Sequence, residues 1–135
     1  MAGFTAAYEE AGFTLANPRN QWSAEREDGA VAVTIGADRI DKTSEPCIYD
    51  TREWSAEQAF ASSVGRTVLK RHVAGRLASG RRDFVLILCH PVDPDVRPRK
   101  VKSARQWHQR VGVIGDGEYD AQTGGFRMEL RPAPA

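Results

Sequence analysis

The chain has 135 residues, of which 41% are hydrophobic and 27% charged, so it can bury one ordinary globular core and needs no disulfide framework. Its net charge of +1 conceals a segregation, with −6 over residues 1–65, +9 over 66–110 and −2 over 111–135. No stretch approaches the roughly 18 apolar residues of a membrane span, and Glu9 and Glu10 interrupt any secretory signal, so we expect a single cytoplasmic domain with no membrane partner.

The first elements predict a short helix and a β-hairpin. Thr5 can cap a helix that ends at Gly12, because glycine readily adopts the left-handed conformation that closes helices. A strand beginning at Trp22 and a return strand over residues 31–35 flank the Asp28-Gly29 turn. Asp-Gly tolerates the positive φ angles of tight turns, so the two strands should pair antiparallel.

The middle of the chain predicts a short strand at residues 47–50 and then one long helix. Ser55 and Gln58 form a capping box, and apolar residues recur at helical spacing until Gly80. Gly65 and Gly75 lie inside this pattern and each costs about 1 kcal/mol relative to alanine, which suggests close backbone packing or a break. Cys47 and Cys89 each lie in an apolar run, and we interpret them as reduced core thiols.

The C-terminal half predicts strands and turns. Residues 84–89 are apolar at every position, which is typical of a central strand buried on both faces. Residues 90–109 are interpreted as a loop, residues 110–114 as a strand, and residues 119–130 as a hairpin turn followed by a strand. Residues 131–135 should form a flexible tail.

The order of these elements predicts an α+β fold. We expect a curved, mainly antiparallel sheet of five to six strands, or a partly closed barrel, because hairpins stand at both ends of the chain. One long helix should pack against the sheet, with a short N-terminal helix beside it.

Catalytic and metal-binding patterns are weak. His90, Asp93 and Asp95 follow the central strand and offer ligands for a metal, although the intervening prolines favour a stiff turn instead. Cys89 and His90 are neighbours on a strand and therefore point to opposite faces, which argues against a cysteine nucleophile. We expect no cofactor and no catalytic residue, and keep a small metal-dependent hydrolase as a second alternative.

The basic segment around Trp107 is the strongest functional candidate. Lysine and arginine neutralise phosphates, and tryptophan can stack on an exposed base. The sequence therefore predicts a non-enzymatic module that binds nucleic acid through a basic loop. The alternative is a protein-interaction or inhibitor module acting on a larger nucleoprotein assembly, with a protein as the partner. The predicted nucleic-acid-binding residues are Arg97, Arg99, Lys100, Lys102, Arg105, Trp107, Arg110, Lys70 and Arg71.

Two stretches, WSAEREDGAVAVTI and FVLILCHPVDPDVRPRKV, resemble a small prokaryotic domain type that has no established activity. The resemblance rests on a Trp-led hairpin and on a buried strand that continues into a Pro-Arg loop. It implies that the loop belongs to the design of the domain, and it transfers no catalytic residue. The predicted fold is also similar to the β-rich PUA and EVE modules, which implies nucleic-acid recognition at the level of fold analogy alone.

Overall fold

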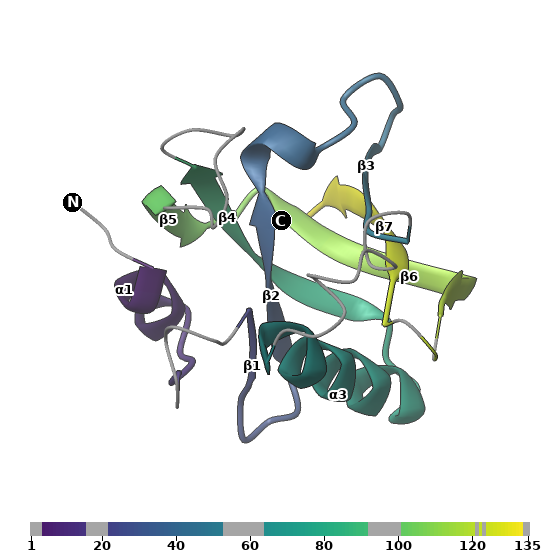
Figure 1. The fold of residues 1–135 in the computed structure, drawn as a ribbon, viewed down its shortest axis with the longest axis horizontal. Coiled ribbons are helices and arrows are strands. Elements are labelled where there is room, and N and C mark those ends of the chain that lie inside the picture. Colours follow the sequence, from purple (N-terminus) through teal and green to yellow (C-terminus); the bar gives the residue numbers. More distant parts are fainter. Residues whose placement is uncertain are drawn as a thin grey trace.

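Two α-helices, one 3-10 turn and seven strands form the part of the chain that the computed structural model describes, namely residues 4–15, 22–52, 64–91, 101–120, 122 and 124–133 (Figure 1). In chain order the elements are α1 (Phe4–Glu10), β1 (Ser23–Glu25), β2 (Val31–Gly36), η1 (Ala37–Arg39), β3 (Cys47–Asp50), α3 (Val64–Ala78), β4 (Asp83–Pro91), β5 (Val101–Gln106), β6 (Arg110–Tyr119) and β7 (Phe126–Pro132).

The strands form one curled, mixed sheet, which bears out the predicted α+β class. The order across the sheet is β1-β2-β4-β6-β7-β3, and β5 pairs with β4 beside that path. Strands β2 and β4 are parallel, whereas the other pairs are antiparallel. The sheet bends into a half-barrel, with α3 beside β1 and β2 (Figure 1).

The sheet is mainly antiparallel, as predicted, but it has seven described strands where five to six were expected, and one pair of them is parallel. Parallel neighbours need a long crossover, and the chain between β2 and β4 includes α3, which lets β4 return in the same direction. The additional strand is β5, which lies within the segment interpreted as a loop. That interpretation was wrong, because an edge strand tolerates lysine and arginine and so lacks a strong hydrophobic pattern.

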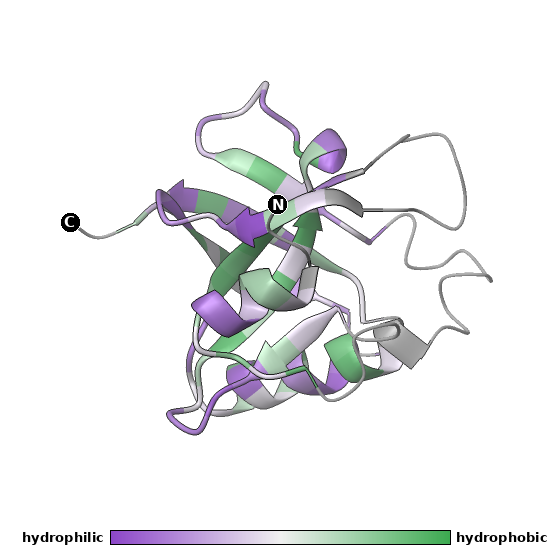
Figure 2. Ribbon diagram, turned by 90° about the vertical axis from the view of Figure 1, so that its left-hand side faces the viewer, coloured by the Kyte–Doolittle hydropathy of each residue, from purple (hydrophilic) through white to green (hydrophobic). Residues whose placement is uncertain are grey.

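The core has two parts, one on each face of β2 and β4. Alternation places Leu86 and Leu88 in the larger core cluster and Ile87 and Cys89 in the smaller one, so the prediction of a strand buried on both faces is confirmed. Figure 2 shows hydrophobic residues along the central strands and hydrophilic ones on the outer turns. The larger core cluster contains Val31, Val33, Ile35, Tyr49, Leu69, Val73, Phe84, Leu86, Leu88, Ile114, Phe126, Met128 and Leu130. The smaller contains Ala7, Tyr8, Ala11, Phe13, Leu15, Ala24, Ala32, Ile87, Cys89 and Ala104.

The glycine turns behave as the sequence predicts. Gly12, Gly29 and Gly80 have φ angles of 89°, 85° and 85°. At the end of α1, Gly12 donates its N–H to the carbonyl of Glu9 at 3.0 Å. At the first hairpin the N–H of Gly29 bonds to the carbonyl of Arg26 at 3.0 Å, so the strand direction reverses where Asp-Gly predicts it.

The main helix is described over 15 residues, Val64–Ala78, and continues through Gly75 without a break. Gly75 is exposed, and a methyl group added there would meet no atom within 4 Å, so the expected close packing at this position was wrong. The predicted capping box at Ser55 and Gln58 lies outside the described residues. Neither α1 nor α3 combines the length and apolar character that a membrane crossing requires.

The C-terminal strand extends into the segment expected to be a tail. β7 continues to Pro132, and the N–H of Ala133 donates to the carbonyl of Gln109 at 2.9 Å. Residues 134–135 lie outside the described part.

Candidate functional site

The structure places part of the predicted nucleic-acid surface. Arg97, Arg99 and Lys100 lie outside the described residues. The backbone of Lys102 belongs to β5, but its side chain is not described. The structure therefore describes only the second half of the basic segment, from β5 to the start of β6.

Lys70 and Arg71 lie on α3, away from β5. The Lys70 ammonium donates to the carbonyl of Gln122 at 3.1 Å, and the Tyr119 hydroxyl donates to the Lys70 carbonyl at 3.3 Å. Lys70 thus ties α3 to the β6–β7 hairpin, while Arg71 is exposed. α3 packs on β1 and β2 whereas β5 packs on β4 and α1, so the described basic residues come from two separate parts of the fold (Figure 1).

Arg110 is engaged within the protein. One of its terminal nitrogens donates to the carbonyl of Leu130 at 2.8 Å and lies 3.6 Å from a carboxylate oxygen of Glu45. A guanidinium held by these groups is less available to a phosphate than an exposed one. Among the predicted residues whose side chains the structure describes, Arg110 is the one that pairs with the acidic N-terminal half.

Four residues of β4, β5 and the turn after β5 share one face, and we call them the β4–β5 platform: His90, Ser103, Arg105 and Trp107. In the antiparallel register Leu88 faces Arg105 and His90 faces Ser103, and residues directly opposite point to the same side. Leu88 belongs to the larger core cluster, against which Trp107 also packs. On this face, Leu88 therefore lies in the core, whereas the side chains of His90 and Arg105 are exposed.

The opposite face of β5 is anchored. Ala104 is 1% exposed and lies opposite Cys89 in the register, inside the smaller core cluster that α1 covers. At the end of β5 the N–H of Trp107 donates to the carbonyl of Leu86 at 2.9 Å. These contacts fix the direction of the platform side chains, although β5 itself has an unremarkable, polar sequence.

Arg105 carries the uncompensated charge of the platform. Within the described ranges its side chain makes no ion pair and no hydrogen bond. Most other described arginines have a carboxylate within 4.0 Å: Arg26, Arg52, Arg76, Arg82, Arg110, Arg127 and Arg131. The field of an unpaired guanidinium remains available to an external anion.

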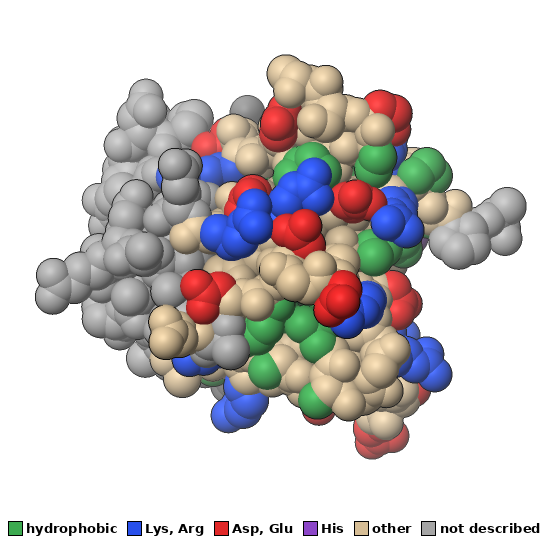
Figure 3. Space-filling model, turned by 90° about the vertical axis from the view of Figure 1, so that its right-hand side faces the viewer, with side chains coloured by type: hydrophobic (Ala, Val, Ile, Leu, Met, Phe, Trp, Pro, Cys, Tyr) green, Lys and Arg blue, Asp and Glu red, His purple; other side chains and the backbone are tan. Residues whose placement is uncertain are grey.

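The outer face of β3, β6 and β7 is neutralised by contrast. Arg52 lies 2.8 Å from Asp50 and 3.1 Å from Glu118, and Arg131 lies 2.7 Å from Glu129. Partial burial would raise the pKa of Asp50, but hydrogen bonds from Arg52 hold it below its ordinary value. Figure 3 shows basic and acidic side chains interspersed on this side of the molecule, so it offers no large area of one sign.

Two chemical arrangements bear on the enzyme alternatives. In the part of the chain that is described, no three His, Cys, Asp or Glu side chains gather as a metal site; Asp93 and Asp95 lie outside it. The Ser23 hydroxyl lies 2.6 Å from Nδ1 of His72, a pair that sequence reasoning missed because 49 residues separate its members. Ser23 is 0% exposed, so this pair joins β1 to α3 and presents no nucleophile to a substrate.

Comparison with protein-family models, with curated proteins and with solved structures gives no match for this chain. The similarity to PUA and EVE modules thus stays a prediction.

Proposed function

We propose that the protein is a non-enzymatic nucleic-acid-binding module whose contact surface includes the β4–β5 platform. The observation that carries this proposal is the exposed, unpaired Arg105 on the same sheet face as His90 and beside Trp107. Cation and aromatic groups side by side are what an unpaired nucleotide requires, because its phosphate needs charge and its base needs a flat surface.

Each platform residue has a distinct part in this proposal. The Arg105 guanidinium would bind a phosphate, and the imidazole of His90 would stack on a base. Trp107 is half-buried and packs against the larger core cluster, so its ring would support the platform. In the sequence, Arg97, Arg99 and Lys100 precede β5 and Lys102 lies within it, and their side chains would extend the phosphate contacts along the chain.

The test is fluorescence anisotropy with labelled single- and double-stranded DNA and RNA, titrated at several salt concentrations. We expect binding that weakens as salt rises. Arg105→Gln should weaken it roughly three- to tenfold and reduce the slope of log K against log salt by about 0.7–0.9.

The matched control is Arg81→Gln, which removes the same charge from an exposed, unpaired arginine just before β4, at the other end of that strand from His90. This variant should bind nucleic acid like the parent protein. Equal losses in both variants would reveal only a general charge effect, and no salt-sensitive binding to any probe would refute the proposal.

A protein partner is the second candidate, and the edge position of β5 favours it. β5 pairs with β4 alone among the described strands, so its second edge can accept an extended segment of another chain. A partner that co-purifies after complete nuclease digestion would support this function. Loss of all partners upon digestion would count against it.

A further inference from the structure

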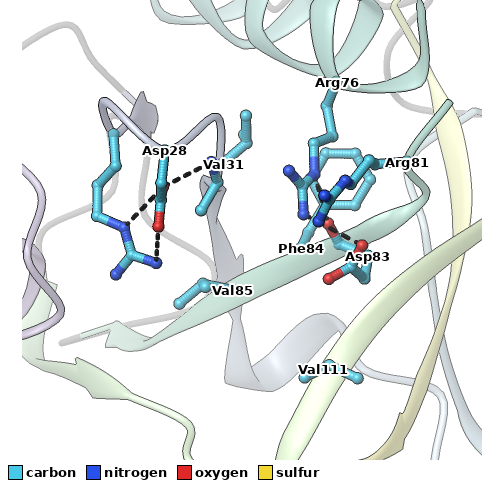
Figure 4. Close-up of a pocket in the computed structure, with 10 residues that line it drawn as sticks. Asp28, Val31, Arg76, Arg81, Asp83, Phe84, Val85 and Val111 are labelled. Atoms are coloured by element: carbon cyan, nitrogen blue, oxygen red, sulfur yellow. Dashed lines mark hydrogen bonds and ion pairs between the residues drawn. The ribbon is translucent and has the colours of Figure 1, made fainter. Parts of the chain in front are cut away.

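A second surface feature lies at the other end of β4, away from the platform. A hollow of about 250 Å³ opens where the β1–β2 turn, the C-terminal end of α3 and the start of β4 meet (Figure 4). Its apolar lining is supplied by Ala30, Val31, Phe84, Val85 and Val111. Three arginines and two aspartates complete the lining, and their pairing decides what the hollow can bind.

Both aspartates are compensated by arginines within the lining. Asp28 lies 3.2 Å from Arg26, and Asp83 lies 3.1 Å from Arg76. Hydrogen bonds from the Ala30 N–H and from Arg26 hold the pKa of Asp28 below its ordinary value, so this carboxylate stays ionised. The two pairs cancel, and the hollow keeps one net positive charge.

That remaining charge belongs to Arg81. Its side chain is exposed, and within the described residues it has neither an ion pair nor a hydrogen bond. Figure 4 shows Arg81 beside Arg76 and Asp83, on the opposite side of the hollow from Asp28. An anion in the hollow would therefore meet a free guanidinium.

Arg76 adds buried donors to the same wall. Only 7% of its side chain is exposed, and it donates to the Asp83 carbonyl at 3.0 Å, the Gly29 carbonyl at 2.8 Å and the Asp83 carboxylate at 3.1 Å. A guanidinium has five N–H groups, so two have no acceptor among the described residues. Buried donors of this kind favour an acceptor oxygen beside them.

The size of the hollow limits the ligand. Its volume of about 250 Å³ is below the 300–1,000 Å³ typical of sites for drug-sized ligands. A volume of this size suits a short carboxylic acid better than a nucleotide. The valine side chains would contact its hydrocarbon part.

We propose that this hollow binds a small organic acid with one carboxylate and a short aliphatic chain. The carboxylate accepts hydrogen bonds from Arg81 and from the unused N–H groups of Arg76. The aliphatic chain lies against Val85 and Val111, which are half-buried and so still reach the surface of the hollow. This site is independent of nucleic-acid binding, because Arg105 takes no part in it.

Pentanoate is the probe, followed by methyl NMR of protein labelled at valine. We expect saturable shifts at Val31, Val85 and Val111, and no saturable shifts with 1-pentanol, which lacks the charge. Arg81→Gln should weaken pentanoate binding tenfold or more, because it removes a charged hydrogen-bond donor. Arg81→Lys should retain part of the affinity, since it keeps the charge.

The control is Arg105→Gln, which should bind pentanoate like the parent protein. Arg81 is exposed, so its replacement should leave the unfolding temperature unchanged and the comparison valid. Absence of saturation with pentanoate, equal binding of 1-pentanol, or unchanged affinity in Arg81→Gln would each overturn the proposal. Arg81→Gln should weaken pentanoate binding alone, and Arg105→Gln should weaken nucleic-acid binding alone. A negative result with pentanoate therefore does not contradict the proposed nucleic-acid binding.

Discussion

Gly75 gives a sharp test of the described helix. It lies in the interior of α3 on the exposed side, with open space where a Cβ would stand. Alanine is favoured over glycine in a helix interior by about 0.8–1 kcal/mol, partly because it restricts the unfolded chain. Gly75→Ala should therefore raise the free energy of unfolding by roughly that amount.

The corresponding temperature shift follows from the length of the chain. At ~2.1 cal/mol/K per residue, 135 residues have an unfolding entropy of about 0.28 kcal/mol/K, so 1 kcal/mol corresponds to roughly 3–4 °C. Urea unfolding followed by circular dichroism would measure the free energy, and thermal unfolding the shift. The denaturant slope should remain unchanged, because the surface exposed on unfolding does not change.

Gly80→Ala is the matched control. An added methyl group there also meets nothing within 4 Å, but the φ angle is +85°. A left-handed conformation costs a non-glycine residue about 1–2 kcal/mol, so this variant should be less stable than the parent. Destabilisation by Gly75→Ala, or stabilisation by Gly80→Ala, would contradict the backbone geometry assigned to the end of α3.

Two further substitutions probe the core and the buried polar pair. Gly112→Ala should lower the free energy of unfolding by about 1–3 kcal/mol, because its methyl group would overlap the Met128 sulfur and lie 2.9 Å from Leu86. In a double-mutant cycle, Gly112→Ala should cost less in a Met128→Ala background than in the parent protein. Burial and the nearby Arg71 lower the pKa of His72. Folding therefore favours the neutral form of His72. Its contribution to the free energy of unfolding is complete above the unfolded pKa of about 6.5, and it is lost as the pH falls from there through the lower pKa of the folded state. Unfolding free energies measured from pH 7.5 to 5 should decline, and less so in His72→Gln; identical slopes would show that His72 is not the cause.

Local patterns predicted the elements whose cause is local. Alternation identified β2 and β7, and the glycines located the helix ends and the first hairpin. β5 escaped because Ala104 is its single core contact among Ser103–Gln106, and one small apolar residue produces no visible periodicity. The parallel pairing of β2 with β4 depends on the path of the intervening chain, which no local pattern records.

The candidate site, too, could be predicted only in part. Its residue types pointed to the basic segment, but their availability depends on distant groups. Lys70 and Arg110 are engaged by the carbonyls of Gln122 and Leu130, which are 52 and 20 residues away. Any backbone carbonyl can accept a hydrogen bond from a lysine or arginine side chain, so the sequence does not show which of these side chains are engaged within the protein. The hollow is lined by three separate segments of the chain, so no single stretch of the sequence predicts it.

The parallel pairing of β2 with β4 also sets the order in which the protein can be completed during synthesis. Ile35 faces Leu88 in this pair, so 53 residues must follow Ile35 before its partner is made. At ~5–20 residues per second this takes roughly 3–10 s, during which β1 is the only described strand with which β2 can pair. During this time the apolar side chains of β2 lack the packing that α3 and β4 later provide. The β6–β7 hairpin closes by local contacts as soon as it is made, so the nascent chain is most vulnerable to wrong association in its first half.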